Sequence, residues 1–485
     1  MNYKVIGRFI SKILAVEAIF MLPALFISIF DGDNRASLSF VFSIFITLGV
    51  SAILFVACRG AKQRFFAKEG MVCVGIGWIA LSLLGCLPFY ISGEIPKFID
   101  ALFEMVSGFT TTGASILPEV EKLSRGIIYW RSFSHWLGGM GVLVFLLAVV
   151  PADGRSNRFT MHILRAESPG PNVGKLAPRM RDTAKILYLL YVFLTILNIL
   201  FLLIGKMPLF DAVCTAFGTA GTGGFGIKND SMAGYSSYIQ NVCTIFMLLF
   251  GVNFSCYYLI LLKKFRTVLK DGELRLYIGL VICSIAAITI NITHLFGNVK
   301  EALHHASFTV VSIITTTGFS TEDFDMWPNF SKAILLILMM IGACAGSTGG
   351  GFKCGRLLLL IKSVRRGIRK TINPNKVEVI RNNGNTISEK MIDGINIYFA
   401  VYFLIILVSF LAVSIEGFSI ITNFSAVVSC FNNIGPGLEL VGPSCNYGIF
   451  GAFSKIILII DMLAGRLEIF PILILFSKET WGRKR

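Results

Sequence analysis

The stretch Ser107–Ala114 reads SGFTTTGA, and it returns later in the chain as SIITTTGF at Ser312–Phe319. Two looser copies are TAGTGGF at Thr219–Phe225 and FNNIGPG at Phe431–Gly437. We refer to these four segments, in chain order, as loops 1 to 4. Each lies between apolar stretches long enough to cross a bilayer. Four copies of one irregular loop at membrane depth are what a four-fold ion pore requires from a single polypeptide.

The composition indicates the environment of the chain. Of its 485 residues 55% are hydrophobic and only 15% are charged, and the mean hydropathy is +0.74. A soluble protein of this length carries far more charge. Short alternating segments typical of a membrane barrel are missing from the sequence. We therefore predict an all-α polytopic membrane protein without a cleavable signal, since the first apolar run, about 9–30, is too long for one. The eleven cysteines, mostly inside apolar stretches, are expected to be small core residues.

The net charge of +16 is distributed unevenly along the chain. Basic residues gather in five segments, and the connections expected on the other side of the membrane are short and often acidic. This asymmetry follows the positive-inside rule, so we expect the basic connections and the C-terminus to be cytoplasmic, in a bacterial inner (plasma) membrane. Orientation and contact with anionic membrane lipid explain the charge, and no nucleic-acid partner is expected. The basic segments are Arg59–Lys68, Arg155–Arg181, Lys263–Arg275, Lys362–Lys390 and Lys478–Arg485.

The order of apolar segments predicts a repeated architecture. Two N-terminal transmembrane helices come first, and then a long span, an apolar segment too short to span, a loop and a second span recur four times. The short segments read as half-helices that enter the membrane and stop partway. The third repeat has a broken second helix. The predicted boundaries are residues 1–68 for the N-terminal helices and 69–182, 183–272, 273–390 and 391–485 for repeats 1 to 4.

The chemistry of the loops suits a monovalent cation. Irregular backbone survives in a membrane only where it is buried in protein or lines a watery path. A half-helix that stops midway points the partial negative charge of its C-terminus at that path, and the loop beyond it offers carbonyl oxygens that can replace hydration water. Glycine permits the positive φ that turns successive carbonyls to one side. The loops contain no carboxylate, which argues against a calcium or magnesium site.

With these motifs the chain resembles the potassium-uptake membrane subunits of the Trk/Ktr/HKT superfamily, specifically the TrkH type. The resemblance covers essentially the whole chain. It rests on the loops together with HWLGGMG at His135–Gly141, CAGSTGGG at Cys344–Gly351, NNIGPG at Asn432–Gly437 and GRLEIFP at Gly465–Pro471. It implies a pseudo-four-fold, channel-like fold that transports K⁺ without a cofactor, a homodimer, and a cytosolic nucleotide-binding, TrkA-like regulatory partner.

The resemblance also implies a selectivity filter. Loops 2 and 4 depart from the full TTTG pattern, so fewer than four equivalent threonine rings can form. The implied K⁺-binding residues are Thr111, Thr112, Gly113, Thr222, Gly223, Gly224, Thr316, Thr317, Gly318, Asn433, Ile434 and Gly435.

Two features beneath the filter are candidate gates. The segment Gly342–Gly351, which we call the intramembrane loop, has a glycine density that breaks a helix. It is expected to be a flexible plug or, alternatively, a close-packing face of small residues; a phosphate-binding loop is disfavoured because the Gly-Lys-Ser/Thr ending is missing. Arg466 is a charge inside the last apolar span. It either forms an ion pair with Asp461 or Glu468 or repels cations at the cavity mouth. The candidate gate residues are Gly346, Ser347, Thr348, Gly349, Gly350, Gly351 and Arg466.

Other polar residues admit more than one interpretation. His135 is expected to serve helix packing, and His304 and His305 to be solvated cap residues or a proton sensor. A group of basic residues would either anchor on lipid headgroups or dock the regulatory partner; it comprises Lys353, Arg356, Arg365, Arg366, Arg369 and Lys370. An enzyme is not expected because no acids, bases or metal ligands converge. The alternative function is potassium symport coupled to sodium or protons, for which intramembrane carboxylates such as Glu104 and Glu468 are the visible candidates.

Overall fold

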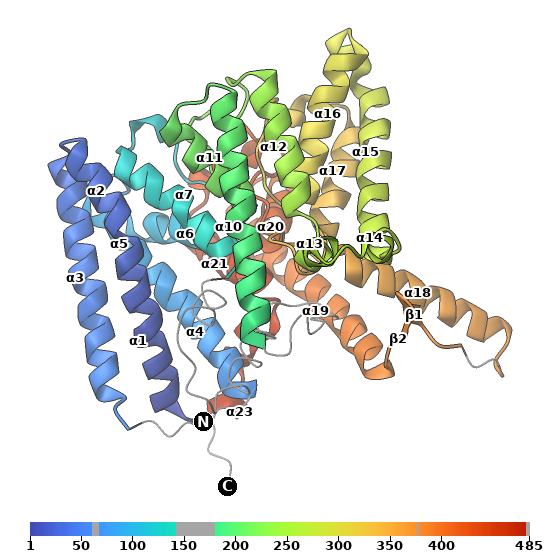
Figure 1. The fold of residues 1–485 in the computed structure, drawn as a ribbon, viewed down its shortest axis with the longest axis horizontal. Coiled ribbons are helices and arrows are strands. Elements are labelled where there is room, and N and C mark those ends of the chain that lie inside the picture. The colour runs from blue at the N-terminus through green and yellow to red at the C-terminus, as the bar shows by residue number, and fades with distance from the viewer. Residues whose placement is uncertain (61–66, 142–179, 376–377, 482–485) are drawn as a thin grey trace.

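A computed structural model describes residues 1–60, 67–141, 180–375 and 378–481, and it is almost entirely helical (Figure 1). The helices stand side by side as a bundle, with both termini at its lower end in Figure 1. Within these residues, six helical segments are long and apolar enough to cross a membrane: Tyr3–Phe30, Asn34–Ala57, Lys68–Ile91, Ala184–Ile204, Gly272–Phe296 and Glu389–Glu416. The expected all-α polytopic membrane architecture is confirmed.

The N-terminal helices form a separate flank of the bundle, drawn in blue in Figure 1. They are α1 (Tyr3–Phe20), α2 (Leu22–Phe30) and α3 (Asn34–Ala57). Two hydroxyl groups join α1 to α3: Ser11 and Ser51 each donate to the other's backbone carbonyl at 2.8 Å. Such short polar contacts let two apolar helices pack closely. Gly126 and Ser28 bring this flank against repeat 1, since a Cβ at Gly126 would overlap the Ser28 hydroxyl.

Four repeats follow, each with a long outer helix, a short pore helix that ends at a loop, and an inner helix. The outer helices are α4 (Ala67–Gly85, followed by α5, Leu87–Ile91), α10 (Met180–Ile204), α15 (Gly272–Phe296) and α19 (Glu389–Val413). The pore helices are α6 (Phe98–Phe109), α11 (Leu209–Gly221), α16 (Val299–Ile314) and α20 (Ile420–Asn432). The inner helices begin with α7 (Arg125–Gly139), α12 (Ser237–Phe250), α17 (Asn329–Ile341) and α21 (Ala452–Arg466).

Burial distinguishes the pore helices from the outer ones. In α20 every residue from Ser425 to Asn432 is buried, and in α6 every residue from Phe103 to Phe109 is buried. The outer helices α10, α15 and α19 bury a much smaller share of their residues, and they expose large apolar side chains such as Leu404 and Ile290. A helix with an apolar outside faces lipid, whereas one buried on all sides lies at the centre of the bundle. The half-helices predicted from their length therefore form the core.

The inner helices are broken in more repeats than the sequence indicated. We expected a break only in the third, and there α17 is followed by the intramembrane loop and α18 (Cys354–Ile372). In repeat 2, however, α12 and α13 (Phe254–Leu261) meet at 88°. In repeat 4, α21 and α22 (Phe470–Phe476) are separated by the three residues 467–469, of which Glu468 and Ile469 have positive φ. In repeat 1, α7 ends at Gly139, and residues 142–179 of the predicted repeat 69–182 lie outside the described residues.

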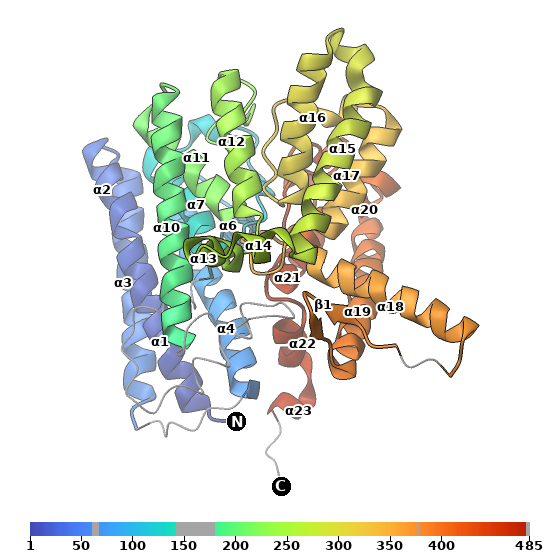
Figure 2. The ribbon, with the colours of Figure 1, turned by 45° about the vertical axis from the view of Figure 1, so that its right-hand side comes forward.

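The lower side of the bundle carries basic helical segments of the described chain. Helix α18 projects sideways from it, as Figure 2 shows, and a two-residue hairpin, β1 (Arg381–Asn382) with β2 (Asn385–Thr386), follows. The Lys362 ammonium joins α18 to the hairpin by donating to the Arg381 carbonyl at 3.0 Å. The short α14 (Phe265–Leu269) lies near the same level, and α23 (Lys478–Trp481) ends the described chain beside α1, where Tyr3 stacks on Trp481. The 3-10 turns lie in the connections at Val120–Lys122, Phe324–Met326, Ser414–Glu416, Glu439–Val441 and Tyr447–Ile449.

Candidate functional site

Each pore helix ends in the same left-handed turn, although the loop sequences differ. The turn residue has a φ of 55° to 58° in all four repeats, at Thr111, Thr222, Thr316 and Asn433. The next amide then donates to a carbonyl five residues back, which caps the helix by satisfying an otherwise orphaned carbonyl. These pairs are Thr112 with Ser107 (2.9 Å), Gly223 with Gly218 (2.9 Å), Thr317 with Ser312 (2.8 Å) and Ile434 with Ser429 (3.0 Å).

The four loops meet around one axis in chain order. In each loop a glycine with φ between 72° and 103° follows the turn, and its α-carbon faces the backbone of the next loop. A Cβ added there would come close to the carbonyl oxygen of the residue that precedes the next loop's glycine. The pairs are Gly113 with Gly223, Gly224 with Thr317, Gly318 with Ile434, and Gly435 with Thr112, the last at 2.8 Å. The fourth pair returns to loop 1, so the ring is closed.

An open cavity lies against this ring. All four loop glycines line it, together with residues of the connections that follow the loops, such as Ser115, Asn229, Ser320 and Tyr447. The Tyr447 hydroxyl donates to the Gly435 carbonyl at 2.7 Å and so supports loop 4 from behind. The structure therefore brings together every predicted filter residue, in one ring that opens to a shared cavity.

Side-chain oxygens strengthen loops 1 and 3 in the same way. The hydroxyl groups of Thr110 and Thr112 lie 2.8 Å apart, and the equivalent pair in loop 3 has the same separation. Loop 4 lacks these hydroxyls and uses an amide instead. The Asn433 Nδ2 donates to the Thr112 Oγ1 at 3.0 Å and to the Met462 carbonyl at 2.9 Å. The asparagine thus joins loop 4 to loop 1 and to α21. A threonine could not donate both hydrogen bonds, because its hydroxyl carries a single proton.

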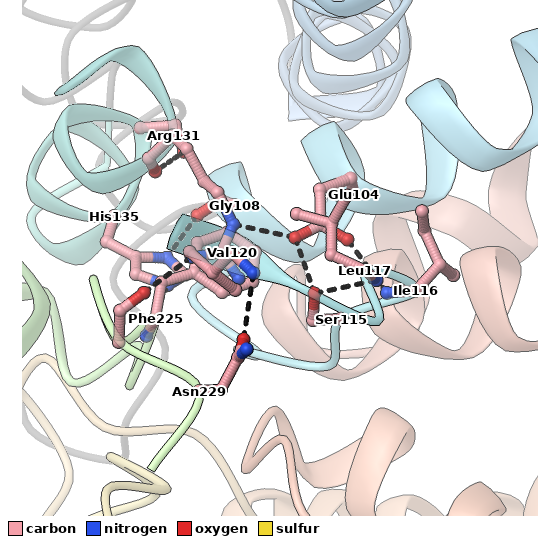
Figure 3. Close-up of polar contacts among 12 residues, drawn as sticks. Glu104, Gly108, Ser115, Ile116, Leu117, Val120, Arg131, His135, Phe225 and Asn229 are labelled. Carbon is pink, nitrogen blue, oxygen red and sulfur yellow. Dashed lines mark hydrogen bonds and ion pairs between the residues drawn. The ribbon is translucent and has the colours of Figure 1, made fainter. Parts of the chain in front are cut away.

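A buried ion pair stands behind loop 1 (Figure 3). The Arg131 Nε of α7 donates to the Glu104 Oε1 of α6 at 2.7 Å, and both side chains are at least 98% buried. The Glu104 carboxylate also accepts from the Ser115 hydroxyl and the Ile116 amide, each at 2.9 Å. A second guanidinium nitrogen of Arg131 donates to the Gly226 carbonyl at 2.9 Å. The pair therefore fixes the segments that follow both loop 1 and loop 2.

His135 connects the same two repeats (Figure 3). Its Nδ1 lies 2.7 Å from the Gly108 carbonyl oxygen, and its Nε2 lies 3.2 Å from the Phe225 amide. Because a carbonyl only accepts and an amide N–H only donates, the proton must be on Nδ1. The ring also fills the space beside Gly223, where a Cβ would overlap it. His135 thus does more than the helix packing we expected: it holds loop 2 against the end of α6.

The intramembrane loop lies directly beneath the ring. It contains all six predicted loop gate residues, and three of its glycines, Gly342, Gly346 and Gly351, have φ of 73° to 77°, which explains why glycine is used there. Its amide at Gly350 donates to the Thr316 Oγ1 of loop 3 at 2.7 Å. A Cβ at Gly350 would overlap the Asn432 carbonyl oxygen. The segment is therefore packed against loops 3 and 4.

Arg466 joins the intramembrane loop to repeat 1. Its guanidinium donates to the Thr348 carbonyl at 2.7 Å and to the Gly139 carbonyl at 2.7 Å, and it also donates to the Gly138 carbonyl. Glu468, one of its two expected ion-pair partners, instead pairs with Arg356. An arginine can bridge these separate carbonyls because its donors diverge in a fixed plane.

The expectation that Lys353 and Arg356 reach lipid headgroups or a partner is wrong because both side chains are buried. Lys353 and Arg356 are 7% and 8% exposed, so neither reaches lipid headgroups or a docking surface. The Lys353 ammonium instead donates to the Gly349 carbonyl within the intramembrane loop. Glu104 and Glu468, the carboxylates suggested for a second ion site, are each paired with an arginine.

The upper histidines are half-buried rather than solvated caps. The His304 Nε2 lies 2.6 Å from the Gln240 Oε1, and the His305 Nδ1 lies 3.0 Å from the Thr321 hydroxyl. The Gln240 amide nitrogen donates to the carbonyls of the connection after loop 2, at Met232 (2.9 Å), Ala233 (3.4 Å) and Tyr235 (3.1 Å). These contacts join repeat 2 to the start of α16.

The comparisons with known proteins agree with this architecture. A family model described as "Cation transport protein" (TrkH) matches residues 36–482. The chain is 36% identical over 491 residues to "Trk system potassium uptake protein TrkH" of Salmonella typhimurium and 35% identical over 494 residues to that of Escherichia coli K12, with 99% of this chain and 100% of each relative covered. It is also similar to the crystal structure of the potassium transporter TrkH from Vibrio parahaemolyticus, with a TM-score of 0.88, 31% identity, and coverage of 99% and 100%.

Proposed function

Because this chain belongs to the TrkH family of cation transport proteins, we propose that it takes up potassium through the ring of loops 1 to 4. The closed ring carries the proposal: each loop glycine lies against the carbonyl of the neighbouring loop, which places four sets of backbone oxygens around one axis. Such oxygens replace the hydration shell of K⁺. The C-termini of four pore helices point at the ring and favour a cation there.

Carboxylates at the upper mouth favour cation arrival. The Glu439 side chain follows loop 4, and hydrogen bonds from Ser419 and Thr422 lower the pKa of its carboxyl below the usual value. Asp323 and Glu121 are also in the upper connections, where they accept from Ser444 (2.9 Å) and Asn229 (2.7 Å). Negative charge around a mouth raises the local cation concentration. It lies outside the ring, so it attracts cations without binding them in the filter.

Substituting loop glycines tests the filter. Gly318→Ser places a Cβ in contact with the Ile434 carbonyl, whereas Gly417→Ser, at a similar φ (79° against 83°), has open space around it. Both variants place a side chain at nearly the same positive φ, and they differ in the contact with the ring. Expressed in a strain that lacks potassium uptake, Gly318→Ser is expected to lose growth at low potassium, and Gly417→Ser to keep it. Equal growth of the two variants would refute the assignment.

The intramembrane loop and Arg466 act as the gate in this proposal. The contacts from Arg466 to Thr348 and Gly139 hold the loop in place beneath the ring. Arg466→Ala removes both the contacts and a positive charge from the path, so the basal Rb⁺ flux in proteoliposomes is expected to rise several-fold. Arg466→Lys keeps the positive charge but loses the planar set of guanidinium donors. An intermediate flux would separate the effect of the charge from the effect of the hydrogen bonds. Unchanged flux in a folded Arg466→Ala protein would exclude this role.

Regulation in this proposal comes from a cytosolic nucleotide-binding partner that meets a homodimer on the lower, basic side. Exposed basic residues of α18, Arg365 and Lys370, supply the docking charge. Reversing both to glutamate is expected to abolish the nucleotide dependence of flux in native membrane vesicles, with the basal flux kept. The homodimer has a separate test, in which light scattering in detergent is expected to give the mass of two chains. A flux that responds to nucleotide as before would place the partner elsewhere.

A further inference from the structure

Four equivalent positions in the ring have unequal hydrogen bonds. Thr111, Thr222, Thr316 and Asn433 share the left-handed turn and are all fully buried. The Thr222 hydroxyl donates to the Gly221 carbonyl at 2.6 Å, and Asn433 contacts loop 1 and α21. The Thr111 hydroxyl has no hydrogen-bond partner within the described part of the chain. Among these four, Thr316 is the one that accepts from the intramembrane loop, through the Gly350 amide.

The hydrogen bond between the Gly350 amide and the Thr316 hydroxyl is tightly packed on the side that faces the ring. A Cβ at Gly349 would stand 2.8 Å from the Thr315 carbonyl oxygen, and one at Gly350 would approach the Asn433 Oδ1 to 3.1 Å. The intramembrane loop is thus pressed against the inner ends of loops 3 and 4. On its other side it is held by Arg466. The Gly350 amide is buried, and a buried N–H that loses its acceptor is costly, so the loop is not free to leave while Thr316 is its acceptor.

We propose that the Thr316 hydroxyl is a latch that holds the intramembrane loop closed against loop 3, and that Thr316 is therefore a positioning residue for gating rather than only a member of the ring. This rests on the proposed gate. Opening must break the Gly350–Thr316 bond, which leaves the Thr316 hydroxyl without this partner, as the Thr111 hydroxyl is without one within the described part of the chain. One neutral hydrogen bond shifts a two-state equilibrium by roughly three- to ten-fold. That is the expected rise in the open fraction when the latch is removed.

Thr316→Val and Thr111→Val form a matched pair for the test. Valine keeps the shape and the β-branch of threonine, so the strain at positive φ is unchanged and only the hydroxyl is lost. Both variants remove one hydroxyl from the same level of the ring, but only the first removes the latch. In proteoliposomes of the full chain without partner, basal Rb⁺ flux is expected to be about three- to ten-fold higher for Thr316→Val than for Thr111→Val. Thr316→Ser, which keeps the hydroxyl acceptor, is expected to give a lower basal flux than Thr316→Val.

A second readout does not depend on flux. Cys344 lies in the intramembrane loop and is 1% exposed. Its modification by a small maleimide, located by mass spectrometry, is expected to quicken in Thr316→Val and to stay at the wild-type rate in Thr111→Val and Thr316→Ser. Equal fluxes and equal Cys344 labelling in the two valine variants would overturn the latch. If the wild-type protein gives no Rb⁺ flux while Cys344 labelling still separates the variants, the proposed transport function fails and the latch stands.

Discussion

At the scale of single residues, Arg131 shows how one buried charge can serve two loops. Its guanidinium meets Glu104 behind loop 1, the Gly226 carbonyl after loop 2, and the face of the Phe225 ring, 3.5 Å from the centroid. A lysine has no planar fork and could not make these contacts together. Because both charges are out of water, the pair is stabilising only while both members are present.

Removing one member of this pair is therefore expected to be severe. Arg131→Met leaves the Glu104 carboxylate buried without its counter-charge, and the expected loss of stability is about 3–5 kcal/mol. Arg125→Met is the control: Arg125 also pairs with an aspartate, Asp31, at 3.0 Å, but is 56% exposed, and its loss is expected to cost less than about 1 kcal/mol. Thermal unfolding in detergent measures both. Similar midpoints for the two variants would contradict this account.

Residue chemistry explains what the sequence could predict about the ring and what it could not. The glycines and the TTTG repeats identified the ring residues because few other reasons place such loops between apolar spans. The sequence did not predict the bridging roles of His135 and Arg131, because each depends on a partner about 90 residues away. Arg131 itself was a visible signal, being a charge in an apolar helix.

At the scale of elements, the breaks of the inner helices position the gate. The intramembrane loop contacts the break between α12 and α13: the Phe254 amide donates to the Gly346 carbonyl at 3.0 Å, and the Cys344 amide donates to the Gly251 carbonyl at 3.1 Å. Asn253 begins α13 by accepting from the Ser255 amide at 2.9 Å. The sequence predicted only the third break, since glycine density was the signal used. The capping Asn253 and the Pro471 after the fourth break were weaker signals of the same kind.

The two asparagine caps of α13 and α16 allow a matched prediction. Asn253 and Asn298 each accept from the amide two residues on, at 2.9 Å and 3.0 Å, so alanine at either is expected to cost about 1 kcal/mol. Only Asn253 also contacts the intramembrane loop, at Gly346. We therefore expect Asn253→Ala alone to raise the basal Rb⁺ flux. Equal fluxes in proteoliposomes at equal loss of thermal stability would show that the α12–α13 break does not support the gate.

At the scale of the whole molecule, the connections above the ring form a continuous belt in which each repeat is bonded to the next. The sequence could give the number of repeats but not their order around the axis, because no residue pattern records which loops touch. The four junctions are Val120 with Asn229 (2.8 Å), Met232 with Ser320 (3.0 Å), Ser444 with Asp323 (2.9 Å) and Tyr447 with Ser115 (2.8 Å).

The fourth junction has to join the end of the chain to its beginning, and a buried ion pair reinforces it. The Lys455 ammonium of α21 lies 2.6 Å from the Asp100 carboxylate of α6, across 355 residues, and is 6% exposed. If this pair closes the ring, Lys455→Met and Asp100→Asn are each expected to destabilise the protein, and the double variant to lose less than their sum, with a coupling of about 0.5–3 kcal/mol.

The control pair for this cycle lies within one repeat. Lys332 and Asp325 are 3.7 Å apart and about a quarter exposed, so their coupling is expected to stay below about 1 kcal/mol. Thermal unfolding in detergent gives both couplings. Potassium-limited growth then distinguishes closure from mere stability, because opening the 4–1 junction separates Gly435 from Thr112, whereas the Lys332 pair is not part of that junction. Additive effects at Asp100 and Lys455, with growth unchanged, would mean that loop contacts alone hold the ring closed.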